Sequence, residues 1–143
     1  MIKMKAIITT DSEILDKRLL TILTGISGLE ISASVKNVQE AFIFIKNIKP
    51  DVLIISPHHL TLTDFDSLKE IRVYNENLLI IILTSDTSSE YVKMWESAGA
   101  NFVFDQAIQI NKLVDVLCSI LYKKHFNAIQ TENSLNKIGK SHL

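Results

Sequence analysis

The sequence has one cysteine, no excess of charge of either sign and no long apolar run, and each absence argues against a class of protein. A single cysteine cannot form an internal disulfide. The net charge of −1 gives no sign of the concentrated basic face that nucleic-acid binding requires. The longest apolar run, Leu78–Leu83, is far shorter than the roughly 20 residues that cross a bilayer. The first residues lack the apolar core of a signal peptide. We therefore expect a soluble cytoplasmic protein without a membrane segment.

The length and the apolar content fit one globular domain. The chain has 143 residues, which is the common size for a single hydrophobic core, and 47% of them are apolar. Cys118 lies in an apolar helical run, so we expect it to be buried as a small hydrophobic side chain.

Five segments have the pattern of β-strands. Lys5–Thr9, Val52–Ser56 and Leu78–Thr84 are continuous in Ile, Val and Leu, as expected for parallel strands that are covered on both faces. Leu29–Val35 alternates in part, and Asn101–Phe104 is short and aromatic. These two weaker segments complete a predicted set of five strands.

Helical patterns separate the strands, and capping residues mark several of their ends. The expected caps are Asn37, Thr63 with Asp64, and Thr87 at helix starts, and Gly99 at a helix end. Strands that alternate with helices of this length predict five β-α units. The predicted fold is α/β: a doubly wound five-stranded parallel sheet with helices on both faces.

In such a sheet the chemistry lies beyond the carboxyl ends of the strands. The segments to inspect are therefore Thr9 to Ser12, Ser56 to His59, Thr84 to Asp86, and Asp105 to Ala107. His58 and His59 are adjacent to each other and have no further ligand at a suitable spacing. We interpret them as exposed loop residues in preference to metal ligands.

The last apolar stripe is expected to end the domain. It runs from Leu113 to Leu121, and after Lys124 the sequence turns polar and loses its periodicity. We predict a domain over residues 1–123 and a helix extension or flexible tail over 124–143. This segment is too short for a helix-turn-helix DNA-binding domain.

Three motifs carry a resemblance to a known family. Lys49–Ile55 leads into a buried strand, Ala98–Ala100 forms a turn before the last strand, and Phe104–Gln106 ends that strand. Their order and spacing over about residues 4–122 resemble response regulator receiver domains, the CheY-like modules of bacterial two-component systems. The sequence looks closest to receivers that precede LuxR/NarL-type DNA-binding domains. The resemblance implies a flavodoxin-like (βα)5 three-layer sandwich and a role in phosphorelay signal transduction.

The resemblance also implies a phosphorylation pocket, and this sequence departs from it. A working receiver has an acidic pair, an aspartate phosphoacceptor, a Ser or Thr, and a lysine at successive strand ends. The matching residues here are Thr10 with Asp11, Ser56, Thr84 and Gln106. Ser56 stands at the phosphoacceptor position. Two of the family's five functional side chains remain, Asp11 and Thr84.

These substitutions change the chemistry of the pocket. Mg²⁺ prefers anionic oxygen ligands, so Asp11 alone should hold it weakly or not at all, and no other cofactor is expected. Ser56 is a poor nucleophile without a base beside it. The neutral amide of Gln106 is expected to hydrogen-bond Ser56 or Thr84. We do not expect an enzyme.

The leading hypothesis is a pseudo-receiver that binds a protein partner without phosphorylation. The partner would be a histidine kinase or an output protein. The expected contact face is formed by the fourth helix, the fifth strand and the fifth helix, with Tyr91, Met94 and Val103 as candidate residues. A homodimer through the same face is a further option. We expect Trp95 to lie in the core.

Three other functions stay open. The chain could accept a phosphoryl group from a histidine kinase on Ser56 or on a nearby acceptor such as Asp64 or Asp66. It could be the receiver fragment of a LuxR-type transcriptional regulator. It could also be a sensor whose remodelled pocket holds a small molecule that the sequence does not name.

Overall fold

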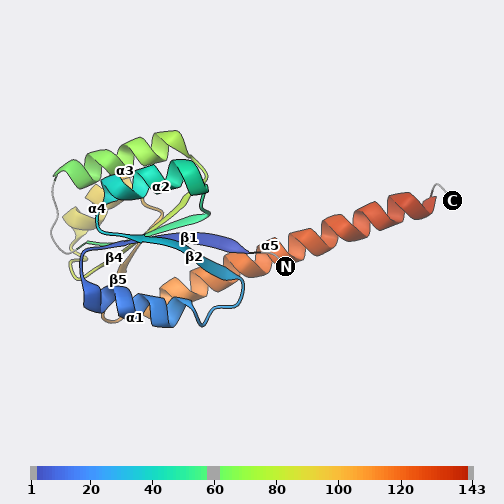
Figure 1. Cartoon of the computed structure of the whole chain (residues 1–143), viewed down its shortest axis with the longest axis horizontal. Coiled ribbons are helices and arrows are strands. Elements are labelled where there is room, and N and C mark those ends of the chain that lie inside the picture. Colours follow the sequence, from blue (N-terminus) through green and yellow to red (C-terminus); the bar gives the residue numbers. More distant parts are fainter. Residues whose placement is uncertain (1–2, 58–61, 142–143) are drawn as a thin grey trace.

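The computed structural model describes residues 3–57 and 62–141, and the side chains of this part as far as residue 135. The loop residues His58, His59 and Leu60 lie outside it. Five strands form one parallel sheet (Figure 1). They are β1 (Met4–Thr10), β2 (Leu29–Val35), β3 (Val52–Ser56), β4 (Leu79–Thr84) and β5 (Phe102–Asp105). The strand order is β2-β1-β3-β4-β5, and every neighbouring pair is parallel.

Helices cover both faces of the sheet (Figure 1). They are α1 (Glu13–Leu23), α2 (Val38–Ile48), α3 (Leu62–Tyr74), α4 (Ser89–Ala98) and α5 (Ile110–Ser141). α2, α3 and α4 pack on one face, while α1 and α5 pack on the other. The predicted doubly wound three-layer fold is confirmed.

Two apolar layers hold the sheet between the helices. Along β1, Ile7 belongs to the layer under α2, α3 and α4, whereas Ala6 and Ile8 belong to the layer over α1 and α5. All three side chains are fully buried. The continuous Ile, Val and Leu runs of the sequence therefore reflect strands that are buried on both faces.

Two of the expected helix ends are confirmed. The Asn37 side chain accepts a hydrogen bond from the backbone N–H of Glu40 at 2.9 Å and caps α2. Gly99 ends α4 with φ 118°, in the left-handed region that favours glycine. A Cβ atom at this position would lie 2.9 Å from the Cβ of Arg72, so the close approach of α3 also requires glycine here.

Two expected helix starts were wrong. α3 begins at Leu62, so Thr63 and Asp64 lie inside its first turn and do not precede it. The cap of α4 is Ser88, one residue after the expected Thr87. The apolar stripe locates the middle of each helix, whereas the first turn depends on how the preceding loop enters it.

The expected burial of Cys118 was also wrong, because its side chain is exposed. Leu113 and Leu117 are the residues of this stretch of α5 that lie fully in the core. Each helical residue is rotated by about 100° from the one before it. An apolar residue next to a core position can therefore point to solvent.

α5 continues well past the sheet and projects away from the rest of the molecule (Figure 1). The segment predicted as a helix extension or a flexible tail is helical as far as Ser141. Within the described part of the chain, no helix combines the length and the apolar character needed to span a membrane.

A single arginine ties α3 to the starts of two strands. The side chain of Arg72 is partly buried, and this burial lowers the pKa of its guanidinium group from the usual value. Its N–H groups donate six hydrogen bonds to five acceptors, which are the backbone carbonyls of Asn75, Glu76, Leu78 and Gly99 and Oδ1 of Asn101. Asn101 Oδ1 also accepts the backbone N–H of Ile80, which extends the link to β4.

Replacing Arg72 by lysine should destabilise the fold, because an ammonium group cannot reach all of these acceptors at once. We expect the free energy of unfolding in urea to fall by about 2–3 kcal/mol, the scale of lost hydrogen bonds to a charged group. Lys69→Met, at an exposed position of the same helix, serves as the control and should change it little. Equal unfolding midpoints for the two variants would contradict this role of Arg72.

Candidate functional site

The carboxyl edge of the sheet brings the predicted pocket residues together. Thr10 and Ser56 are register partners at the ends of β1 and β3. Thr84 ends β4 and is the register partner of Asp105 on β5. The backbone N–H of Gln106 donates to the carbonyl of Thr84 at 3.0 Å. Asp11 follows directly after β1. The residues that the sequence analysis grouped together therefore lie at one edge of the sheet.

Buried hydroxyls dominate this cluster. Ser56 is 2% exposed, and Thr10 and Thr84 are buried as well. Thr10 Oγ1 accepts the backbone N–H of Ser12 at 3.2 Å, and Thr84 Oγ1 accepts that of Asp86 at 3.1 Å. Each threonine therefore closes the turn that follows its strand, a common use of a hydroxyl at such a position.

Three oxygen atoms at this edge of the sheet have no hydrogen-bond partner among the described residues. They are Ser56 Oγ, Thr9 Oγ1 and Gln106 Oε1, and all three are buried atoms. The described residues do not form the expected hydrogen bond between the Gln106 amide and Ser56 or Thr84. The structure joins Gln106 to Thr84 through the main chain.

Thr9 was not singled out by the sequence analysis. Strand alternation places it on the face of Ile7, toward α2, α3 and α4, and places Thr10 on the opposite face. The available signal was a second hydroxyl at the end of a strand whose three preceding residues, 6–8, are apolar.

The nearby carboxylates differ in their surroundings. Asp11 is exposed. Asp86 Oδ1 accepts the backbone N–H of Ser88 at 3.1 Å, and Asp105 Oδ1 accepts that of Ala107 at 2.8 Å, so both carboxylates stabilise their own turns. The described residues contain no group of three or more His, Cys, Asp or Glu side chains placed to hold a metal ion.

Tyr91 approaches the pocket from α4. Burial raises the pKa of its hydroxyl, and the negative charges of Asp86 and Asp64 raise it further. Its ring packs edge-on against Phe65 and Trp95, with ring centroids 6.5 and 6.2 Å away. Tyr91 is therefore tied to the core as well as to the pocket.

The three residues proposed as a partner surface differ in exposure. Met94 is 45% exposed, whereas Tyr91 and Val103 are half-buried and pack against the core. Trp95 is fully buried, as expected. The sequence analysis did not select Phe102, which is 38% exposed on β5 and stacks on Phe104.

We next compared the sequence and the structure with known proteins. No family model matches the sequence. The chain is 27% identical over 105 residues to a protein-glutamate methylesterase/protein-glutamine glutaminase of Methanococcus maripaludis. That alignment covers 72% of this chain and 29% of the relative, so the chain matches less than a third of the relative's length.

Solved structures match more of the chain. The signal receiver domain of the response regulator NarL from Mycobacterium tuberculosis superposes with a TM-score of 0.74 at 12% identity, over 84% of this chain and 97% of that one. The chain has the receiver fold. A chain from the complex of CheX and CheY with beryllofluoride and Mg²⁺ from Borrelia burgdorferi superposes with a TM-score of 0.72 at 21% identity. That match covers 84% of this chain and 90% of the other.

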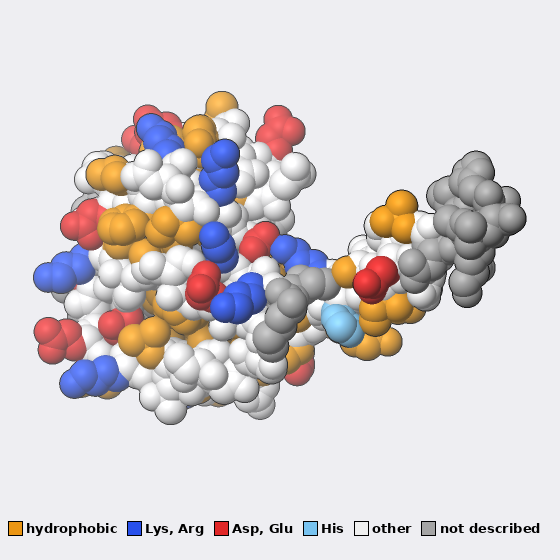
Figure 2. Space-filling model, turned by 45° about the vertical axis from the view of Figure 1, so that its right-hand side comes forward, with side chains coloured by type: hydrophobic (Ala, Val, Ile, Leu, Met, Phe, Trp, Pro, Cys, Tyr) orange, Lys and Arg blue, Asp and Glu red, His pale blue; other side chains and the backbone are white. Residues whose placement is uncertain are grey.

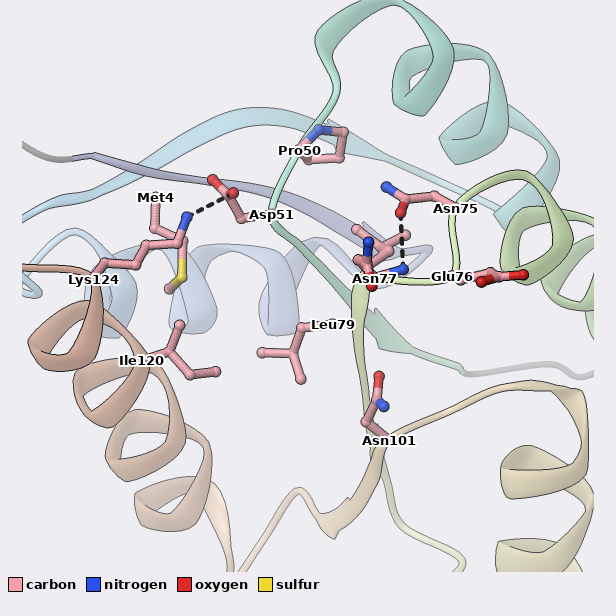
Figure 3. A pocket seen from close by; sticks show the side chains of 11 residues that line it. Met4, Pro50, Asp51, Asn75, Glu76, Asn77, Leu79, Asn101, Ile120 and Lys124 are labelled. Carbon is pink, nitrogen blue, oxygen red and sulfur yellow. Dashed lines mark hydrogen bonds and ion pairs between the residues drawn. The ribbon is translucent and has the colours of Figure 1, made fainter. Parts of the chain in front are cut away.

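A hollow lies at the amino-terminal edge of the sheet, opposite this cluster (Figure 3). Its volume is about 520 Å³, and the loop between α3 and β4 forms one wall. On the other wall, Lys124 Nζ of α5 lies 2.8 Å from Asp51 Oδ1, which precedes β3. The other carboxylate oxygen of Asp51 accepts the backbone N–H of Lys5. Asp51 thus joins β1, β3 and α5.

The unpaired hydroxyl of Ser56 leads to a stability prediction. Ser56→Ala removes a buried polar atom without breaking a hydrogen bond to a described residue. We expect the free energy of unfolding to stay within about 0.5 kcal/mol of the natural protein or to rise. Thr84→Val is the matched comparison and should lower it by about 1 kcal/mol, because the Asp86 N–H loses its acceptor. A larger loss for Ser56→Ala than for Thr84→Val would show that the Ser56 hydroxyl has a partner.

Proposed function

We propose that this chain is a pseudo-receiver, a protein-binding module of two-component signalling that works without phosphoryl transfer. The observation that supports this most directly is Ser56. At the position that the receiver resemblance assigns to the phosphoacceptor, the chain has a buried hydroxyl in place of a carboxylate.

A hydroxyl in this environment is poorly suited to accept a phosphoryl group. It becomes a strong nucleophile only when a neighbouring base takes its proton. Thr10, its register partner, has no basic group, and Asp11 is exposed beyond the strand end. Phosphoryl transfer also requires in-line access, whereas Ser56 is almost fully buried.

The charge of the pocket supports the same conclusion. Mg²⁺ binding depends on anionic oxygen ligands in near-octahedral geometry. Of the carboxylates at this edge, Asp86 and Asp105 each hold a backbone N–H of their own turn, which leaves Asp11 as the candidate ligand. Gln106 supplies no positive charge for a phosphoryl group. We therefore expect weak Mg²⁺ binding or none.

The proposed output is contact with a protein, either a histidine kinase or an output protein, in the cytoplasm. The face formed by α4, β5 and α5 is the candidate surface, and a homodimer through it is a second option. Met94 and Phe102 provide exposed apolar area there. One of the matched structures comes from a complex of CheX with CheY, which shows a protein–protein complex among the fold's relatives. We do not assign an enzymatic reaction to the chain.

The test compares the natural pocket with a restored one. Isothermal titration and intrinsic fluorescence of the buried Trp95 would be recorded with Mg²⁺, alone and with beryllofluoride. The natural protein should give neither heat nor a spectral change. The triple variant Thr10→Asp, Ser56→Asp and Gln106→Lys restores the carboxylates and the lysine that the resemblance implies. It should bind Mg²⁺ and beryllofluoride, because negative ligands and a cation then surround the site.

Saturable binding to the natural protein that disappears in Asp11→Ala would contradict the proposal. A Mg²⁺-dependent phosphoprotein formed from acetyl phosphate would contradict it as well, and mapping the acceptor would then separate Ser56 from Asp64 and Asp66. The restored variant is the positive control, since its binding shows that the fold can still present a working pocket.

A further inference from the structure

The projecting end of α5 has one side that nothing in the described structure covers. Lys124 links α5 to the body through its ion pair with Asp51 (Figure 3), and residues 125–135 after it are all exposed. Residues 125–141 then continue as helix for roughly 25 Å, at about 1.5 Å per residue. Helices in proteins owe most of their stability to the packing of an apolar face. A protruding helix of this length therefore suggests a missing partner.

A row of exposed apolar side chains begins just before this segment and continues into it, and Figure 2 shows hydrophobic side chains along the projecting helix. Tyr122 is 71% exposed, Phe126 49% and Ile129 40%. Their spacing is four and then three residues, and Asn133 follows four residues later. We call these four residues the arm seam. Alternating steps of three and four residues are the spacing of a coiled-coil interface.

The arm seam faces away from the body. At about 100° per residue, each of its members lies within roughly 40° of the direction opposite Lys124. Lys124 points toward Asp51 and the sheet, so the body leaves the seam open. We propose that the arm seam pairs in parallel with the arm seam of a second copy of this chain.

A second copy in parallel fits the residues of the seam. With Phe126 at heptad position a, Tyr122 and Ile129 fall at d and Asn133 at the next a. Two asparagines that face each other at an a position favour a parallel dimer in one register, at some cost in stability. The exposed Asn133 would meet its own copy only if the helices run parallel and in register.

The charges beside the seam match the same arrangement. Glu132 is exposed and occupies position g. The sequence has Lys137 five residues later, at the following position e. In parallel coiled coils a g residue pairs with the e residue five positions further along the partner helix. In this heptad register, the sequence therefore has opposite charges at a g position and at the following e position.

The other side of the helix is less suitable. Leu135 is 63% exposed, but it lies on the same side as Lys124 and Leu117. Further back along α5 that side is packed on the sheet, because Leu117 is fully buried in the core. A parallel partner on that side would collide with the body. The arm seam avoids this collision and leaves the carboxyl edge with Thr10 and Ser56 uncovered, since the arm departs from the amino-terminal edge.

The first test measures the mass of the full-length chain in solution by sedimentation velocity over a range of concentrations. We expect a reversible dimer. Ile129→Glu should weaken dimerisation by about ten-fold or more, because it buries a charge in the seam. Asn127→Glu places the same charge on the same exposed segment outside the seam and should leave the dimer unchanged. Met94→Glu, on the α4 surface, should also leave it unchanged.

The second test fixes the orientation by cross-linking. In a Cys118→Ser background, Asn133→Cys should form a disulfide between two copies under mild oxidation, since a positions of parallel helices face each other. Thr131→Cys, on the opposite side of the helix, should not. The proposal would be overturned if the natural protein is monomeric, or if the two cysteine variants cross-link equally. It would also be overturned by a dimer that survives Ile129→Glu or is lost in Met94→Glu. Circular dichroism of each variant shows whether it is folded, so that a loss of dimerisation can be told from unfolding.

Discussion

Burial of a parallel sheet on both of its faces is the constraint on which the other features of this structure depend. The strands can be continuous in Ile, Val and Leu because α2, α3 and α4 cover one face and α1 and α5 cover the other. Parallel strands also end at the same edge, so residues distant in sequence meet there. Thr10, Ser56 and Thr84 are brought together by strand order and register.

The residues that the resemblance assigns to a receiver pocket lie together at this edge, with different chemistry. Hydroxyls and an amide stand where the resemblance implies carboxylates and a lysine. The two threonine hydroxyls close turns, and the carboxylates of Asp86 and Asp105 do the same. These four polar groups thus stabilise the local backbone. This use of the residues is consistent with a pocket that contributes to stability and shape more than to ligand binding.

The opposite edge carries the structural links. Arg72 donates hydrogen bonds to backbone carbonyls of the α3–β4 loop and of the turn before β5. Asp51 joins β1, β3 and α5. An ion pair as exposed as that of Lys124 with Asp51 adds little stability. Its position matters more, because it marks the point at which α5 leaves the body. The arm begins at the edge that is remote from the pocket, so the two regions can serve different partners.

The sequence by itself determined the five strands and the doubly wound sheet, and it placed Thr10, Asp11, Ser56, Thr84 and Gln106 at or just after strand ends. Apolar runs and the order of elements carry this information, because burial on two faces leaves few alternatives. The structure alone decided what these side chains contact. It joined Gln106 to Thr84 through the main chain, left the Ser56 hydroxyl without a described partner and placed Cys118 at the surface.

The starts of α3 and α4 and the course of residues 125–141 also needed the structure. The first residue of a helix depends on the conformation of the preceding loop, and it can differ by one or two residues from the position that local sequence predicts. The helical extension is polar on most sides, so its periodicity is weak in the sequence. Its apolar side becomes evident only when Lys124 shows which side of α5 faces the body. The pattern of buried residues can be read from neighbouring positions in the sequence. The contacts between side chains that are distant in sequence depend on tertiary packing.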